Sequence, residues 1–345
     1  MAASLKEIAQ ASGVSVATAA RFLNGDQKEV WASTARRAQR VREIARQMGY
    51  RPNHRAKSLA RKCSMAIGML FGREGVFYAD VYHRIIARVS EQLAHNGYDL
   101  MMIPAIGPAS QWSAKLMDGR VDACIVCDPA PDELQQVLEN IDLPMLGINL
   151  STDAQIPMIR YNEAQGAQMV VEHLLDLGHR RFWFAAYDMP QYKSLKHISF
   201  VTRLKIIRQI LKEHGLEQEF QYQTRSVPQQ VQMIADMPVS QRPTAIIAQN
   251  DQRAMEVMQA LHTHGIKVPD DISVVGFNND NSSAHYIPAL TTIDLPVLGA
   301  SDRAVKYLLD HLQNKKTTDQ TDTGILDMVL DERLIIRQST AKVRN

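Results

Sequence analysis

The chain lacks the features that mark secreted or membrane-spanning proteins. Only three of its 345 residues are cysteines, an odd number that predicts no disulfide framework. No apolar run approaches the roughly 18 residues that suggest a membrane span. Polar residues, Lys6 and Glu7 among them, interrupt the N-terminus where a secretory segment would be apolar. With a hydrophobic content of 45%, these absences predict a globular protein of the cytoplasm with two or three domains.

Signatures of catalysis and of cofactor binding are also missing. The sequence has no P-loop, no G-x-G-x-x-G after a strand and no nucleophile elbow. Cys124 and Cys127 form a Cys-x-x-Cys, a spacing that would also suit zinc or a redox pair. They stand in an apolar, β-type run without a second Cys or His pair at metal spacing, so buried strand thiols are the better interpretation. We therefore expect neither an enzyme nor a bound metal or cofactor.

The two ends of the chain differ in charge. Residues 1–62 hold 13 Lys and Arg against 4 Asp and Glu, a net charge of +9. The other 283 residues hold 26 basic against 33 acidic residues, a net charge of −7. A basic end on a mildly acidic body is typical of a protein whose one end meets the phosphates of a nucleic acid.

A helix-turn-helix pattern occupies residues 4–25 of the basic end. Apolar residues recur at helical spacing from Leu5 and stop at Ser12-Gly13, and Ser15 can N-cap a second helix. The inward residues of this second helix would be Val16, Ala19 and Leu23. In such a motif the second helix can lie in the DNA major groove. A plain helical hairpin is the alternative, and the charge of +9 makes it the weaker one.

The next residues predict a third helix and a basic linker. The helix spans about 34–48 and completes a small domain over residues 1–50. A proline then stops regular structure, and Asn53 can N-cap a short basic helix within a linker at 51–63. So short a helix is marginal in water unless a partner docks against it.

From Met65 onward, short apolar segments alternate with helical ones. MAIGMLF (65–71) and TAIIA (244–248) are examples of such predicted strands. Strands of this kind imply parallel sheets that helices cover on both faces, and two successive runs imply two doubly wound lobes with a cleft between them. Residues 325–336 are predicted as one last strand.

These stretches resemble one known family. LKEIAQASGVSVATAARFLNG (5–25) and GYRPNHRAKSLARK (49–62) are similar to the start of lactose-repressor (LacI/GalR) family regulators. LLDLGHRR (174–181), PTAIIAQNDQRAM (243–255) and VPDDISVVGFNND (268–280) resemble the effector-binding core of that family, in the expected order. The resemblance implies an all-α helix-turn-helix DNA-binding head with a hinge helix. An α/β two-lobed, periplasmic-binding-protein-like core of doubly wound parallel sheets would follow.

The resemblance also sets the expected limits of the lobes. The core would cover residues 64–345, with the first lobe at about 64–160 plus 294–320. The second lobe would take about 161–293 plus 321–340. The loop at 26–33 is longer than is usual in the family. No leucine-heptad tail follows Arg337, so we expect a dimer and no tetramer.

By the resemblance, DNA contacts come from the second helix and the hinge helix. Val16 and Ala17 cannot form side-chain hydrogen bonds and would meet thymine methyl groups, whereas Arg21 would read guanine. Leu59 occupies the position of the hinge residue that inserts into the minor groove; an incidental leucine in a basic linker is the alternative. The expected DNA-binding residues are Ser15, Val16, Ala17, Thr18, Arg21, Asn24, Asn53, Arg55, Ala56 and Leu59.

The effector would bind in the cleft of the core. Arg203 fills the position of an arginine that binds effector hydroxyls or carboxylates, and Asp251 would accept sugar hydroxyls or clamp Arg203. Asn278 and Tyr161 stand where the family generally has aspartate, which favours an acidic, phosphorylated or aromatic ligand over an ordinary sugar. Surface or packing roles for these residues are the alternative. The expected effector-binding residues are Phe77, Tyr78, Tyr161, Arg203, Asp251 and Asn278.

The sequence therefore predicts a sequence-specific transcriptional regulator, expected to act as a repressor on a pseudo-palindromic DNA operator as a homodimer. A sugar-like, acidic or phosphorylated metabolite between the lobes would control its operator affinity. A small-molecule binding protein of the periplasmic type is the second hypothesis, against which the basic head and the missing secretory segment argue. An α/β enzyme acting on sugars or nucleotides is the third, and no motif supports it.

Overall fold

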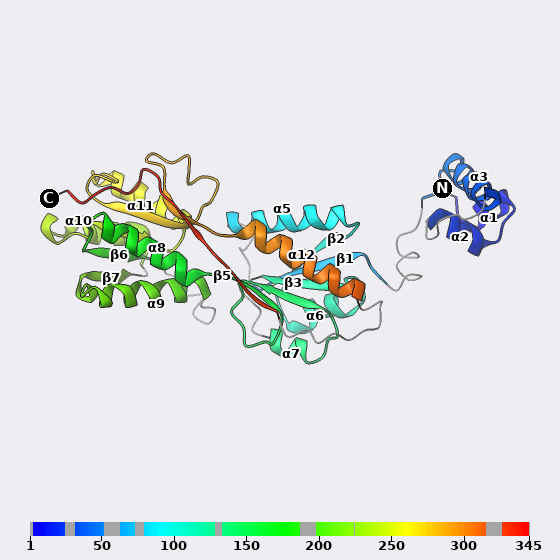
Figure 1. Ribbon diagram of the computed structural model, residues 1–345, viewed down its shortest axis with the longest axis horizontal. Coiled ribbons are helices and arrows are strands. Elements are labelled where there is room, and N and C mark those ends of the chain that lie inside the picture. The colour runs from blue at the N-terminus through cyan, green and yellow to red at the C-terminus, as the bar shows by residue number, and fades with distance from the viewer. Residues whose placement is uncertain are drawn as a thin grey trace. The chain divides into compact units, whose positions relative to one another are not determined.

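The computed structural model describes residues 3–24, 32–51, 63–72, 79–127, 133–186, 198–223, 225–314 and 326–344. The chain divides into two compact units, Met1–Ser64 and Met65–Asn345 (Figure 1). The division therefore falls at the start of the predicted core. Among the helices of the described ranges, none has both the length and the apolar character to cross a bilayer.

Three helices form the first unit: α1 (Leu5–Ser12), α2 (Val16–Asn24) and α3 (Ala32–Gln47). Reciprocal capping starts α1, because the Glu7 amide donates to Ser4 Oγ at 3.3 Å and the Ser4 amide donates to Glu7 Oε2 at 2.6 Å. Gly13 ends α1 with a φ of 67°, in the left-handed region that glycine adopts without steric cost. These local signals produce the tight turn between α1 and α2.

Small and aliphatic side chains from all three helices fill the core of this head. Its buried members are Ile8, Ala9, Ala19, Phe22, Ala38, Val41 and Ala45. The prediction of Val16 as an inward residue was wrong, since its side chain is 46% exposed. Phe22 is buried instead, because it lies three residues on from Ala19 and removes more apolar area from water than a valine. Arg42 of α3 fixes this arrangement by donating from Nε to the Phe22 carbonyl at 3.2 Å.

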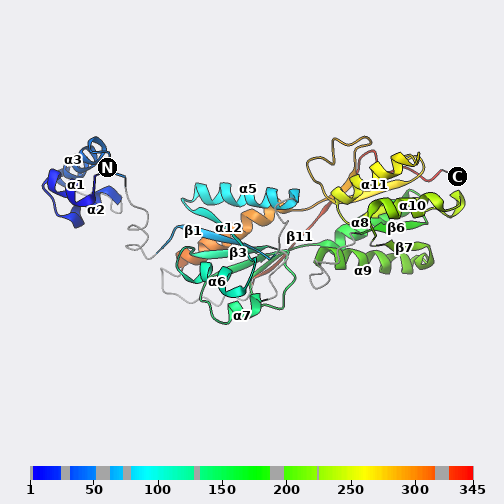
Figure 2. The same ribbon diagram turned by 180° about the vertical axis from the view of Figure 1, so that it is seen from behind.

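The first sheet of the core has six parallel strands in the order β11-β5-β4-β3-β1-β2. They are β1 (Ala66–Phe71), β2 (Asp99–Pro104), β3 (Ala123–Cys127), β4 (Met145–Ile148), β5 (Met158–Tyr161) and β11 (Asp327–Leu330). Helices α5 (Asp80–His95) and α12 (Val297–Asn314) cover one face, and α6 (Ala109–Met117) and α7 (Leu134–Leu138) cover the other (Figure 2). Cys124 and Cys127 are buried on opposite faces of β3, which confirms them as strand thiols.

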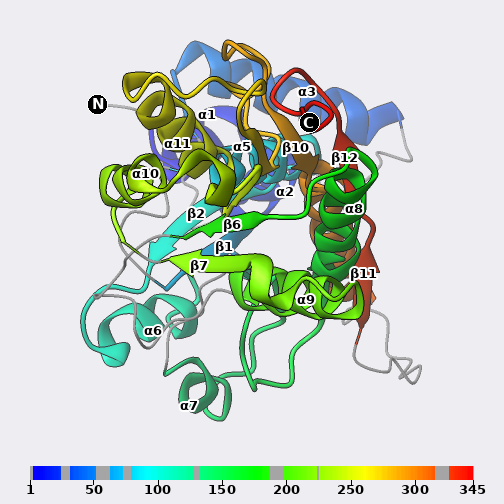
Figure 3. The same cartoon turned by 90° about the vertical axis from the view of Figure 1, so that its left-hand side faces the viewer.

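The second sheet also has six strands, in the order β12-β10-β9-β8-β6-β7, with β12 antiparallel to its neighbour. They are β6 (Phe182–Ala185), β7 (Phe220–Gln223), β8 (Ala245–Ala248), β9 (Ser273–Asn278), β10 (Thr291–Asp294) and β12 (Arg333–Ile335). Helices α8 (Glu163–Asp176) and α9 (Ile198–Glu213) cover one face, and α10 (Val227–Asp236) and α11 (Asp251–Thr263) cover the other (Figure 3). Short 3-10 turns, η3 (Glu217–Glu219) and η4 (Val239–Gln241), precede β7 and β8.

The last strands correct the predicted lobe limits. Residues 325–336 were expected to form one strand of the second lobe, but they contain two strands, one in each sheet. β11 pairs with β5 in the first sheet, a strand that the sequence had not predicted, and β12 pairs with β10 in the second. The break falls at Glu332, whose amide donates to the Gln165 side chain at 3.0 Å instead of to a strand. Segment 327–330 therefore belongs to the first lobe.

In the described residues the chain passes three times between the lobes. The passages lie between β5 and α8, between β10 and α12, and between β11 and β12. Residues beside these passages, and the loops that follow β8 and β9, meet where the two sheets approach each other.

Candidate functional site

The start of α2 presents a set of small side chains to solvent. Ser15 caps the helix as predicted, since the Thr18 amide donates to its Oγ at 3.1 Å and the two hydroxyls lie 2.8 Å apart. Val16 and Ala17 are exposed, and so is Arg21 one turn further along. The backbone of α2 includes Asn24, whose side chain lies outside the described part of the chain. The expected base-reading side chains Val16, Ala17 and Arg21 are therefore all exposed on one helix.

Other predicted contacts cannot be placed. The hinge residues Asn53, Arg55, Ala56 and Leu59 lie outside the described residues, as does the aromatic pair Phe77 and Tyr78. Exposed arginines of α3 add positive charge to the described part of the head: Arg36, Arg37 and Arg40. The head thus carries unburied cations on a second helix besides α2.

Arg203 lies at the centre of a buried ionic cluster, which we define as Glu163, Arg203 and Glu332. Its Nε donates to Glu163 Oε2 at 2.6 Å, and its Nη1 donates to the Gln249 carbonyl at 2.9 Å. Its guanidinium carbon also lies 4.1 Å from the centre of the Phe277 ring, a cation–π arrangement. Gln249 directly follows β8 and Phe277 lies near the end of β9, so Arg203 lies at the carboxyl edge of the second sheet.

The partner of Arg203 differs from the predicted one. Asp251 was expected to accept sugar hydroxyls or to clamp Arg203, and the second of these roles falls to Glu163, the first residue of α8. Both side chains of the Arg203–Glu163 pair are 4% exposed. Asn149, which follows β4 of the first sheet, donates from Nδ2 to Glu163 Oε1 at 3.1 Å and so ties the cluster to the other lobe.

Glu332 brings a second carboxylate into this cluster. It lies on the passage between β11 and β12, and it is 2% exposed. Neither of its carboxylate oxygens has a hydrogen-bond partner among the described residues. Burial, and next the charge of Glu163, raise the pKa of Glu332 to about 8. Glu332 thus lies buried near the Arg203–Glu163 ion pair without a hydrogen bond of its own, and burial favours its protonated form.

Asp251 holds the loop after β9 against the sheet. The carboxylate is fully buried and accepts hydrogen bonds from Thr292 Oγ1 at 2.5 Å and from the Asp280 amide at 2.8 Å. Burial, and then the neighbouring Asp280 charge, raise the pKa of Asp251 well above its usual range. In this conformation both carboxylate oxygens of Asp251 accept hydrogen bonds from residues of the second lobe.

Asn278 is part of a hydrogen-bonded contact between the lobes. Arg84, from α5 of the first lobe, donates through Nη1 to the carbonyls of Asn278 at 3.0 Å and Asn279 at 3.3 Å. Asp80, one turn earlier on α5, accepts from the Asn281 amide and side chain at 3.4 and 3.1 Å. We call these five residues the interlobe latch. Asn278 and Asn279 have φ values of 109° and 51°, in a region where asparagine is enriched.

Tyr161 does not face a ligand surface in this conformation. It ends β5, is 6% exposed and packs in the core of the first lobe. Its hydroxyl has no hydrogen-bond partner within the described ranges, and burial raises the pKa of the phenol well above its usual value.

Comparisons with known proteins agree with this architecture. A model of bacterial regulatory proteins, lacI family, matches residues 4–53, and a model of the periplasmic binding protein-like domain matches residues 171–340. The HTH-type transcriptional repressor PurR of Aliivibrio fischeri (strain ATCC 700601 / ES114) is 27% identical over 327 residues, 91% of this chain and 93% of the relative. The crystal structure of the lac repressor dimer bound to operator and the anti-inducer ONPF has a TM-score of 0.82 at 25% identity, covering 99% of this chain and 100% of that chain.

The chain belongs to the lacI family of bacterial regulatory proteins. Another relative, the HTH-type transcriptional repressor PurR of Vibrio atlanticus (strain LGP32), is 25% identical over 350 residues, 99% of this chain and 100% of the relative. Membership in the lacI family confirms the predicted fold class, a helix-turn-helix head on a two-lobed α/β core. It also makes this chain a DNA-binding transcriptional regulator with a metabolite-binding core. A small-molecule binding protein without DNA function is thereby set aside.

Within the lacI fold, the sequence did not reveal several residues of the lobe junction. Glu163 and Glu332 lie 169 positions apart in the chain, and nothing local predicts that both are buried near Arg203. One signal was available in Gly166, because a Cβ at this position would overlap the Glu332 carboxylate. Arg84 gave no signal, since an arginine in an amphipathic helix is most simply read as a solvated one.

Proposed function

We propose that this lacI-family chain is a repressor that binds a pseudo-palindromic operator as a homodimer, and that a small metabolite bound between its lobes changes operator affinity. The capped, exposed start of α2 in a head with a net charge of +9 carries this proposal. The lac repressor structure, a dimer bound to operator, supports the assembly. Binding to bacterial DNA would place the protein in the cytoplasm.

On DNA, α2 would enter the major groove with its N-terminal residues towards the bases. Val16 and Ala17 offer methyl groups to thymine, and Arg21 offers a bidentate donor to guanine. Ser15, Thr18 and Asn24 would fix the helix on phosphates. The hinge residues Asn53, Arg55, Ala56 and Leu59 would act in the minor groove, as the resemblance implies.

Arg21→Ala is expected to weaken binding to the preferred operator by about 1–3 kcal/mol and to relax specificity at one base pair per half-site, because Arg21 reads a base edge. Lys57→Ala, in the basic linker, should weaken all sequences alike and flatten the salt dependence. Selection from a random DNA library, followed by titrations at several salt concentrations, measures both effects. An unchanged base preference in Arg21→Ala would exclude the assignment.

The metabolite would bind beside the buried ionic cluster and the interlobe latch. Arg203 is already neutralised by Glu163, and Glu332 adds a carboxyl group that forms no hydrogen bond with the described residues. These charges support a ligand rich in O–H or N–H donors over a phosphorylated one, contrary to the preference that Asn278 and Tyr161 suggested. Such a ligand changes operator affinity only if it binds one lobe arrangement better than another. Residues on both sides of the junction, Arg84 and Asn278 among them, would supply that difference.

Arg84→Ala is expected to speed amide hydrogen exchange about 10- to 100-fold in the loop at 278–281, since hydrogen bonds from a charged donor contribute about 1.5–3 kcal/mol. Arg88→Ala is the matched control, because Arg88 lies one turn along α5 and pairs with Asp302 of α12 within the first lobe. Exchange measured by mass spectrometry on both variants tests the latch. Equal exchange of the loop in both variants would contradict it.

A further inference from the structure

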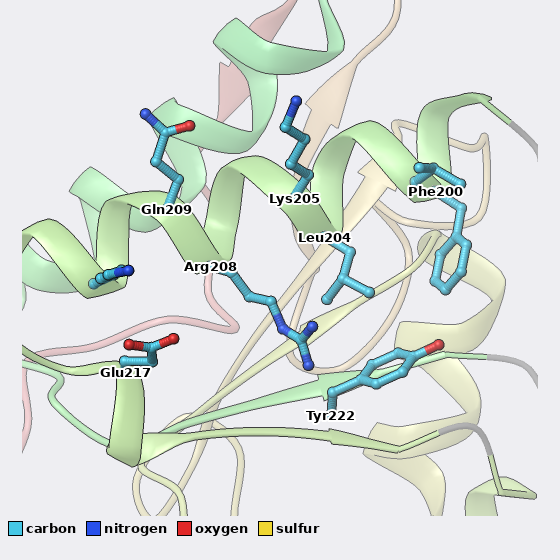
Figure 4. Close-up of a pocket in the computed structure, with 9 residues that line it drawn as sticks. Phe200, Leu204, Lys205, Arg208, Gln209, Glu217 and Tyr222 are labelled. Atoms are coloured by element: carbon cyan, nitrogen blue, oxygen red, sulfur yellow. The ribbon is translucent and has the colours of Figure 1, made fainter.

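A groove lies on the second lobe, away from the interlobe residues described above. It has a volume of about 560 Å³ and is bounded by α9 and by β7, the last strand of the second sheet. Figure 4 shows Leu204 and Arg208 pointing from α9 towards Tyr222 on β7, with Phe200 beside the ring. Pockets for small molecules occupy about 300–1,000 Å³, so the groove suits a ligand of that size.

Aromatic side chains form the apolar wall of this groove. The rings of Phe200 and Tyr222 lie 6.3 Å apart, and each lies 6.0 Å from the ring of Phe184, which is fully buried beneath them. Because Phe184 cannot move without disturbing the core, it holds the two outer rings in place. A planar apolar group can pack against this wall with the offset or edge-on geometry that aromatic pairs prefer.

Basic side chains outnumber acidic ones among the residues that line the groove. Lys205, Arg208 and Lys212 line it, against one acidic side chain, Glu217. The Arg208 guanidinium lies 5.7 Å from the centre of the Tyr222 ring and 5.8 Å from that of Phe220. None of the ion pairs found among the described residues involves Arg208, and its guanidinium points towards Tyr222 (Figure 4), so its N–H donors are placed to bind a carboxylate.

We propose that this groove is a second small-molecule site, which binds an aromatic carboxylate. The aromatic ring would lie against Phe200 and Tyr222, and the carboxylate would accept paired hydrogen bonds from Arg208. The site lies on the helix that also carries Arg203, because Leu204 follows Arg203 directly in α9. An occupant therefore touches the helix that anchors the buried ionic cluster without entering the junction of the lobes.

Calorimetry of the full-length protein with 2-naphthoate tests this proposal. We expect saturable binding of one ligand per chain with a Kd below about 1 mM. The neutral 2-naphthamide, with the same ring system, should bind at least about tenfold more weakly, a loss of about 1.4 kcal/mol. Arg208→Gln should weaken 2-naphthoate by the same factor, and Lys306→Gln, an exposed cation of α12, should leave its binding unchanged.

Hydrogen exchange locates the bound ligand. Protection by 2-naphthoate is expected in β7 and in the second half of α9, and not in the loop at 278–281. Should Arg208→Gln fail to fold, the double variant Lys205→Gln with Lys212→Gln replaces it, with a smaller loss expected. Absence of saturable binding, equal affinity for the amide, or protection of the loop at 278–281 would each overturn the proposal.

Discussion

Glu332→Gln is expected to raise the free energy of unfolding of the core, by an amount that grows from near zero at pH 4 to roughly 3–5 kcal/mol at pH 8. The pKa of Glu332 is about 8 in the folded chain, against about 4.3 for an unfolded glutamate. At a pH between these two pKa values, the glutamate of the unfolded chain has lost its proton, whereas Glu332 of the folded chain keeps it. The native carboxyl group therefore costs stability as pH rises, and glutamine removes that cost.

Urea unfolding of the full-length protein at several pH values measures this difference. Comparing the variant with the native chain at each pH cancels the titration of groups that the two share. Glu163→Gln is the matched control on the same cluster and should change stability in the opposite direction, because Glu163 accepts the Arg203 hydrogen bond. If Glu332→Gln raises the free energy of unfolding by the same amount at every pH between 4 and 8, the titration of the Glu332 carboxyl group is not the cause of the increase.

Arg203→Gln is expected to lower the free energy of unfolding of the core by about 3–5 kcal/mol at pH 7, the usual cost of breaking a buried ion pair. The substitution leaves Glu163 buried without its cation and beside a second carboxyl group, Glu332.

Arg303→Gln serves as the control for this loss, because Arg303 is exposed on α12 and surface substitutions usually change stability by less than about 0.5 kcal/mol. Chemical unfolding at pH 7 separates the two variants. A cost for Arg203→Gln below about 1 kcal/mol at pH 7 would mean that water or another cation replaces the guanidinium.

Local signals predicted the head of this regulator well. Gly13 and Ser15 predict the turn between α1 and α2, because a left-handed glycine and a capping hydroxyl both act within one helical turn. The same reasoning misplaced Val16, because periodicity alone does not decide which apolar side chain a neighbouring helix covers. Phe22 was the better core residue on grounds of size.

In the core, the alternating pattern predicted two doubly wound lobes, and the family resemblance singled out Arg203. The partner of Arg203 was not predictable, since Glu163 reaches it only through the packing of α8 on α9. The division of the last predicted strand into β11 and β12 could not be predicted from the sequence for a similar reason. Residues 325–336 form one continuous β-type stretch, and only pairing with β5 and β10 decides where it changes sheets.

The three passages between the lobes bear on how this core can be recombined with those of its relatives. A lobe that is entered and left several times is not a contiguous piece of the gene, so one cut cannot separate the two lobes. A fragment that ends after β5 lacks α12 and β11, and with them a covering helix and an edge strand of its own sheet. Chimaeras that exchange a whole lobe therefore need three matched junctions. An exchange at one junction should give chains that misassemble, even where every strand is compatible with its new neighbours.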